Sequence, residues 1–170
     1  GNPIEYIVAN PLNRNKIHIL SSTFFELNPM KDLKLRTMIG IDASDTRSNT
    51  HSLPSYPSNY GSGSVGKGFT HLFNLTWTNT ANYTFNINKT HNFNFLLGHE
   101  VTRNGADSFN VSTRGQSNDK LLTLSTGTTA TGWSDNFSAS TYVSVFARAE
   151  YNLKRNYFID LSIRRDASSK

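Results

Sequence analysis

"FNLTWTNTANYTFNIN", residues 73–88, alternates between apolar and polar side chains over nearly its whole length. Such alternation predicts a β-strand with one apolar and one polar face. The stretch is much longer than the roughly 5–6 residues of an ordinary globular strand. Asn79 alone breaks the apolar register. A strand of this kind buries its apolar face either in a protein core or in lipid, and alternation does not choose between them.

Five further segments alternate in a similar way, and helical periodicity is nearly absent. The expected strands are residues 16–28, 33–45, 69–87, 91–103, 139–152 and 156–167. Two long connections, 46–68 and 104–138, contain many Gly, Ser and Thr residues and are expected to be irregular loops. Short and long connections alternate, so the short turns fall at one end of the sheet and the long loops at the other. Outer-membrane barrels show this arrangement, with short periplasmic turns and longer extracellular loops.

The sequence therefore predicts an all-β fold, an antiparallel up-and-down meander of about six long strands. Membrane barrels need about eight strands or more, so we expect residues 1–170 to be a barrel segment of a longer protein. The alternative is a secreted soluble β-sandwich that binds glycans or acts as an adhesin, since a sandwich shows the same alternation.

Composition excludes several classes of function. The chain has no cysteine, so neither disulfides nor thiolate metal sites are expected. Its 17 basic and 12 acidic residues are scattered, and no basic run indicates nucleic-acid binding. The five histidines form no metal-binding pair. Neither a metal nor another cofactor is expected, and no arrangement of Ser, His and Asp indicates an enzyme.

Charged residues in the middle of the strands form the first group of candidate functional residues. His99 and Glu100 are neighbours and so point to opposite faces of a strand, which excludes joint acid–base chemistry. Pairing of Glu100 with an arginine on the polar face is the favoured interpretation. The expected lumen-facing polar residues are Arg36, Glu100, Arg148, Glu150 and Arg164.

Aromatic residues in the expected loops form the second group. Aromatic rings stack on sugars or on peptide side chains and lose little entropy when they are ordered. The candidate substrate-binding residues are Tyr56, Tyr60, Phe109 and Trp133. Packing between loops, or contact with a partner protein, remains an alternative for each. The Gly-rich "YGSGSVGKG" at 60–68 lacks the spacing of a phosphate-binding loop.

"YNLKRNYFIDLSIRRDASSK", residues 151–170, resembles the signature of SusC/RagA-like TonB-linked outer-membrane transporters. Arg148, Tyr151 and Tyr157 match the start of that signature, and Arg164, Arg165, Asp166, Ser168 and Ser169 match its end. Ala167 stands where the family usually has Gly. "DLKLRTMIGID" and "ANYTFNINKTHNFNFLLGHEV" resemble two further family patterns, with Asp32 replacing a usual Gly and with His91, Gly98 and Glu100 in place.

The resemblance covers about residues 10–170 and implies a location in the bacterial outer membrane. Family members are plugged 22-stranded barrels that import oligosaccharides or peptides. The implied partners are a SusD-like surface lipoprotein, the TonB complex, a glycan or peptide ligand and outer-membrane lipid. The plug and the TonB box are absent from this stretch, so energy coupling is expected to lie outside it.

Overall fold

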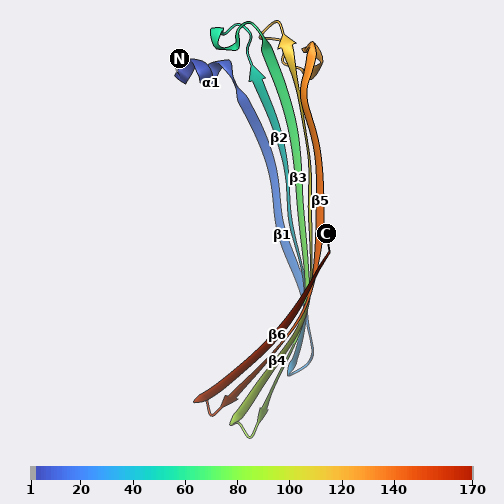
Figure 1. Cartoon of the computed structure of the whole chain (residues 1–170). Coiled ribbons are helices and arrows are strands. Elements are labelled where there is room, and N and C mark those ends of the chain that lie inside the picture. The colour runs from blue at the N-terminus through green and yellow to red at the C-terminus, as the bar shows by residue number, and fades with distance from the viewer. Residues whose placement is uncertain (1–2, 170) are drawn as a thin grey trace. The chain divides into compact units, whose positions relative to one another are not determined.

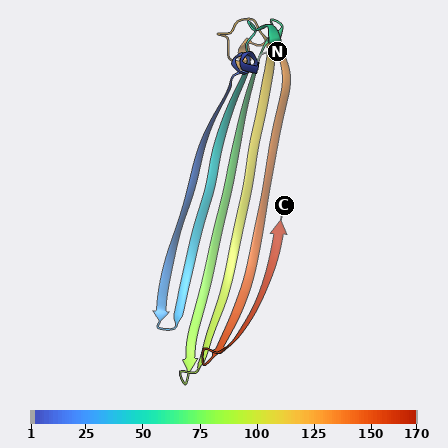
Figure 2. The same cartoon turned by 90° about the vertical axis from the view of Figure 1, so that its left-hand side faces the viewer.

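The computed structural model describes residues 3–169, which form one six-stranded sheet. The strands are β1 (Leu12–Met30), β2 (Leu33–Ser52), β3 (Gly63–Ile87), β4 (His91–Gln116), β5 (Thr129–Leu153) and β6 (Tyr157–Ser169). They neighbour one another in chain order, as Figures 1 and 2 show. The expected all-β meander is confirmed. The β-sandwich alternative is wrong, because the described strands make a single sheet.

Three short helical segments complete the described chain. They are α1 (Pro3–Ala9), η1 (Pro57–Asn59) and η2 (Leu124–Thr126). Within the described residues, no helix has the length and apolar character needed to cross a membrane.

The strands extend further than the sequence indicated. They contain between 13 and 26 residues. The long connections are reduced to 53–62 and 117–128, whereas loops over 46–68 and 104–138 were expected. The expectation was wrong because the outer ends of β2 to β5 carry Gly, Ser, Thr and Asn on both faces. A strand that is polar on both faces shows no alternation of hydropathy, so its sequence looks like a loop.

Tight turns join the strands at the other end of the sheet. The turn between β3 and β4 contains Asn88 and Lys89, and that between β5 and β6 contains Lys154 and Arg155, with φ between 51° and 62° at all four positions. A hydrogen bond across each turn joins the first and fourth residues at 3.0–3.2 Å. Two successive left-handed residues define a type I′ turn, whose twist matches that of the flanking strands.

The chain divides into two units, which are described separately. The loop unit contains the residues up to His18 together with Ala43–Leu72 and Gly105–Ser138. The turn unit contains Ile19–Asp42, Phe73–Asn104 and the chain from Ala139 onward. Every strand except β6 contributes residues to both units.

The turn unit has an apolar face built by odd-numbered residues. The ring of Phe93 stacks on Phe85 and packs against Tyr151, with centroids 4.9 Å apart in both pairs. The Trp77 indole lies edge-on to His99 and donates a hydrogen bond from Nε1 to Thr37 Oγ1 at 2.9 Å. Side chains from β2, β3, β4 and β5 therefore meet on one surface, as the alternation predicted.

The apolar face has no protein core above it. Among the described residues, Ala9 and Val65 are the buried hydrophobic ones, and both belong to the loop unit. Leu161 and Ile163 on β6 are 67% and 74% exposed. Burial of apolar surface is the dominant stabilising term in a soluble protein, so this sheet must bury its apolar face against something outside the chain.

The opposite face of the turn unit is polar and is built by even-numbered residues. Thr84 donates a hydrogen bond to Asn94 at 3.2 Å, and Asn94 donates one to Glu150 at 2.8 Å. The ladder therefore runs from β3 across β4 to β5. Amide and hydroxyl side chains here satisfy one another across the strands, as cross-strand polar pairs do.

Candidate functional site

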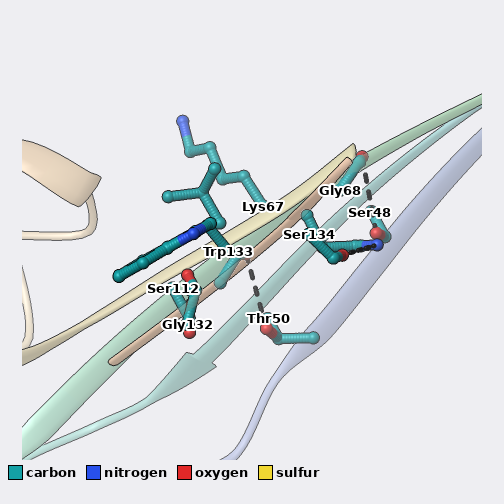
Figure 3. A pocket seen from close by; sticks show the side chains of 11 residues that line it. Ser48, Thr50, Lys67, Gly68, Ser112, Gly132, Trp133 and Ser134 are labelled. Carbon is teal, nitrogen blue, oxygen red and sulfur yellow. Dashed lines mark hydrogen bonds between the residues drawn. The ribbon is translucent and has the colours of Figure 1, made fainter. Parts of the chain in front are cut away.

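A cavity of about 390 Å³ lies on the loop unit, where four strands each contribute small residues (Figure 3). We call this surface the hydroxyl shelf. It comprises Ser48 and Thr50 of β2, Gly66 and Gly68 of β3, Asn110 and Ser112 of β4, and Gly132 and Ser134 of β5. Lys67, Val111 and Trp133 complete the lining.

The glycines of β3 let polar side chains of neighbouring strands lie over its backbone. A Cβ atom on Gly68 would come within 2.3 Å of Asn110 Oδ1 and 2.7 Å of Ser48 Oγ. One on Gly66 would come within 2.4 Å of Thr50 Oγ1. A larger residue at either position would displace these side chains, so the shelf depends on glycine for close approach.

Ser112 Oγ forms a 2.9 Å hydrogen bond with Thr131 Oγ1, whereas other polar groups of the shelf make long contacts. Ser48 Oγ donates to Gly68 O at 3.5 Å, Thr50 Oγ1 to Gly66 O at 3.4 Å, and Asn110 Nδ2 to Ser134 Oγ at 3.4 Å. Hydrogen bonds of this length are near the limit of useful strength. These hydroxyl and amide groups can therefore exchange their present partners for those of a ligand at small cost.

Trp133 borders the cavity, but its side chain lies on the opposite face of β5 from the hydroxyl shelf. It stands between Gly132 and Ser134, which belong to the shelf, and successive side chains of a strand point to opposite faces. Its ring is 80% exposed. Lys67, between Gly66 and Gly68, is turned away from the shelf in the same way. The shelf itself offers hydroxyl and amide groups for hydrogen bonding, which suits a polar ligand.

The other three aromatic candidates are placed differently. Phe109 lies within β4, and its ring packs on Phe69 with centroids 5.9 Å apart, so the expectation of a loop position was wrong. Tyr56 precedes η1 and is half-buried. Tyr60 follows η1 and is 94% exposed. The four residues thus do not form one shared site.

Four of the five predicted polar residues of the strands lie on the polar face of the turn unit, in two arginine clusters. In the first, Arg148 forms a forked pair with Asp160, in which Nη2 donates to Oδ2 at 2.5 Å and Nε to Oδ1 at 3.0 Å. The same Nη2 lies 2.7 Å from Glu150 Oε1. Forked pairing fixes the guanidinium plane, so this cluster ties β5 to β6.

Arg164 is the centre of the second cluster. Its Nη2 lies 3.2 Å from Glu100 Oε1 and donates to Ser144 Oγ at 3.0 Å, while its Nε donates to Asp166 Oδ1 at 2.8 Å. Ser144 also donates a hydrogen bond to Asp166. The expected pairing of Glu100 with an arginine is present, and it spans β4, β5 and β6.

Gly98 and Phe146 lie next to the Arg164 cluster. The Phe146 ring lies over Gly98, so closely that a Cβ there would come within 2.1 Å of its Cζ atom. The Arg164 guanidinium lies 5.6 Å from the centroid of that ring. An aromatic ring packed over a strand glycine in this way helps to fix the register of the paired strands. Arg36, the remaining predicted residue, lies 4.3 Å above the Phe24 ring.

The arginines and carboxylates of the two clusters pair with one another, and the Asp166 carboxylate that accepts from Ser144 is itself paired with Arg164. Within residues 3–169, no three His, Asp or Glu side chains converge as a metal site would require. The two clusters act as cross-strand ties on the polar face.

The shelf was missed from the sequence because its residues lie in segments interpreted as loops. A signal was present. Each of the four strands carries two small residues separated by one position, namely Ser48 and Thr50, Gly66 and Gly68, Asn110 and Ser112, and Gly132 and Ser134. Period-two spacing of small residues places both members on one face of a strand.

Comparison with known proteins gives strong structural matches and none from sequence models. No family model matches the chain, and the curated proteins give no significant match. The structure of the RagAB peptide transporter matches 96% of this chain with a TM-score of 0.91 and 27% sequence identity. The RagAB peptide importer in its "closed-closed" state matches the same share, with a TM-score of 0.92 and 27% identity.

A more distant match shows the fold alone. BauA, the ferric preacinetobactin receptor from Acinetobacter baumannii, matches 94% of the chain with a TM-score of 0.55 and 11% identity. The chain spans about a fifth of the length of the RagAB chains (18–19%) and 26% of BauA. The expected bacterial outer-membrane location agrees with these neighbours and is confirmed. The resemblance to the SusC/RagA-like TonB-linked outer-membrane transporters is confirmed, and the chain corresponds to a segment of their β-barrel.

Proposed function

We propose that the chain is a wall segment of a TonB-dependent transporter that imports a nutrient, either a peptide or an oligosaccharide, across the outer membrane. The match to RagAB over 96% of the chain, at 27% identity, carries this proposal. RagAB is described as a peptide transporter, so peptides are the first class to test. The same proposal includes the prediction from the sequence that residues 1–170 are a segment of a longer protein.

The apolar face of the turn unit contacts lipid in this proposal, and the polar face lines the lumen. The apolar face lacks a protein core, as described above. Near the turns it carries a continuous aromatic cluster of Tyr83, Phe85, Phe93, Phe95 and Tyr151. Outer-membrane barrels place aromatic girdles at the membrane interfaces, so this cluster would lie at the periplasmic one.

The hydroxyl shelf provides nutrient contacts. It has hydroxyl and amide groups, several of them held only by long hydrogen bonds, and it lies on the unit that carries the long connections. Peptide backbones and sugar hydroxyls both form hydrogen bonds with such groups. The role is recognition and not catalysis.

The partners follow from the same proposal. A SusD-like surface lipoprotein covers the extracellular side, and coupling to TonB involves regions outside this chain. The two arginine clusters hold the wall strands together on the lumen side.

Uptake by cells tests the transport function. In a strain lacking the parent gene, we expect the wild-type gene to restore uptake of labelled peptides or oligosaccharides, and to do so only when TonB is present. A Gly68→Val variant, which displaces Asn110 and Ser48, is expected to lower uptake while still reaching the membrane. Restoration by neither class of nutrient, or uptake without TonB, would contradict the proposal.

Lipid quenching tests the orientation of the sheet. Trp77 lies on the apolar face and is 44% exposed, so brominated acyl chains should quench its fluorescence in the reconstituted transporter. A Trp77→Phe variant should lose this quenchable component, whereas Trp133→Phe should keep it. Equal quenching of wild type and Trp77→Phe would show that this face does not contact lipid.

A further inference from the structure

Tyr60 is displayed at the tip of the connection between β2 and β3 in an unfavourable backbone conformation. Its φ and ψ are 52° and 33°, in the left-handed region. Gly61, which follows, has φ of 74°. Glycine adopts this region freely, but a tyrosine there is under strain. The ring is nevertheless 94% exposed, so no packing within the chain compensates for the strain.

The connection that carries Tyr60 is held firmly at its base. Asn59 Nδ2 donates to Leu53 O at 2.9 Å and to Ala9 O at 3.2 Å. Ser55 donates from its backbone N to Asp119 Oδ1 at 3.1 Å and from Oγ to Oδ2 at 2.5 Å. These bonds tie residues 53–62 to the end of α1 and to the connection between β4 and β5. The exposed ring therefore stands on a rigid support.

The geometry suits a protein partner better than a nutrient. A small ligand is held in a concave site that buries most of its surface. Tyr60 projects outward instead. Aromatic residues presented on a rigid support are typical anchors of protein interfaces, where they fill a pocket of the partner. Residues 48–66 contain no Asp, Glu, Lys or Arg, so the segment that carries the ring is itself uncharged.

We infer that Tyr60 is an anchor through which the connection 53–62 binds the surface lipoprotein. This inference rests on the proposed function. The ring enters an apolar pocket of the lipoprotein, and its hydroxyl meets a polar group there. Because the surrounding segment is uncharged, the contact contributes affinity that salt does not screen.

Affinity between the full-length transporter and its lipoprotein, both in detergent, tests the inference. Truncation of an interface anchor costs about tenfold in affinity or more, so Tyr60→Ala should weaken binding at least that much. Tyr60→Phe should stay within about threefold of wild type, because the ring carries most of an anchor's buried area. Tyr60→Gly relieves the left-handed strain and yet should bind as weakly as Tyr60→Ala, which separates loss of the ring from misfolding.

Phe137→Ala is the matched control, since it removes a 78% exposed ring that lies outside both the connection 53–62 and the shelf lining, and it should leave lipoprotein affinity unchanged. The loss caused by Tyr60→Ala should be the same in low and high salt. Lipoprotein affinity within about twofold of wild type in both Tyr60→Ala and Tyr60→Gly would overturn the inference alone. A loss of nutrient binding without a loss of lipoprotein binding would also overturn it. A wild-type transporter that binds no lipoprotein would overturn both this inference and the partner in the proposed function.

Discussion

Replacing Gly98 by valine should destabilise the barrel through the Phe146 ring. A Cβ at Gly98 would lie 2.1 Å, 2.2 Å and 2.7 Å from three atoms of that ring. An aromatic ring is rigid, so the Phe146 side chain could not relieve these contacts by bending and would have to move away from β4. Overpacking of this kind costs about 1–3 kcal/mol. Loss of the ring contacts places the expected decrease in unfolding free energy near the upper end, about 2–3 kcal/mol.

Urea unfolding of the full-length barrel in lipid vesicles measures this effect. Gly40→Val is the matched control, because it also adds a β-branched residue to a strand interior and its Cβ would meet only Thr76 O, at 4.0 Å. We expect Gly40→Val to be neutral or slightly stabilising. In a Phe146→Ala background, Gly98→Val should cost almost nothing further, because the space is then free. Equal costs at Gly98 and Gly40, or additive effects of the two changes, would refute the role of the ring.

Three further predictions concern lipid contact, turn strain and nutrient binding. Asn79→Leu should raise the unfolding free energy in vesicles by about 1–2 kcal/mol if the apolar face contacts lipid as proposed, because it removes an amide from the groove on that face that it shares with Leu35 and Leu97. Asn82→Leu on the polar face, measured in the same urea titration, should give no such gain. Arg155→Gly should raise unfolding stability by about 0.5–1 kcal/mol, because φ is 62° there; a lower urea midpoint would contradict the strain argument. Asn110→Ala should weaken nutrient binding about threefold to tenfold by calorimetry, because it removes an amide from the shelf, whereas Phe137→Ala, outside the shelf lining, should not.

The fold could be predicted wherever the two faces of a strand differ. In residues 73–87 the parity of Phe85 and Trp77 identifies one face and that of Thr84 identifies the other, and the structure places them accordingly. The prediction failed at the outer ends of the same strands. Around Gly66 and Gly68 the side chains on both faces of the strand are small or polar. The hydropathy of successive residues therefore does not alternate clearly there.

The polar residues of the strands were easier to place than those of the shelf. Opposite charges on one face of a sheet attract one another, although pairs as exposed as these gain little free energy. Pairing of Glu100 with an arginine was therefore foreseeable, although the choice of Arg164 depends on register. Register is a property of paired strands and not of one strand, so no single alternating stretch contains it.

Asn79 shows why the face of a strand and its register with the neighbouring strands must be considered together. In the sequence it is one irregularity in an alternating strand. In the structure it lines the same groove as Thr37 and His99 on the apolar face. The Trp77 indole contacts both Thr37 and His99. The Trp77 indole N–H donates to Thr37 Oγ1 and so fills an acceptor site of that hydroxyl without water. Hydrocarbon offers no hydrogen bond to the amide of Asn79, so contact of this amide with lipid is costly, whereas water or a polar neighbouring molecule would satisfy it. A gain in the stability of Asn79→Leu in lipid vesicles, of the size expected above, would therefore show that this position contacts lipid, and the absence of a gain would show that the amide is hydrated or paired.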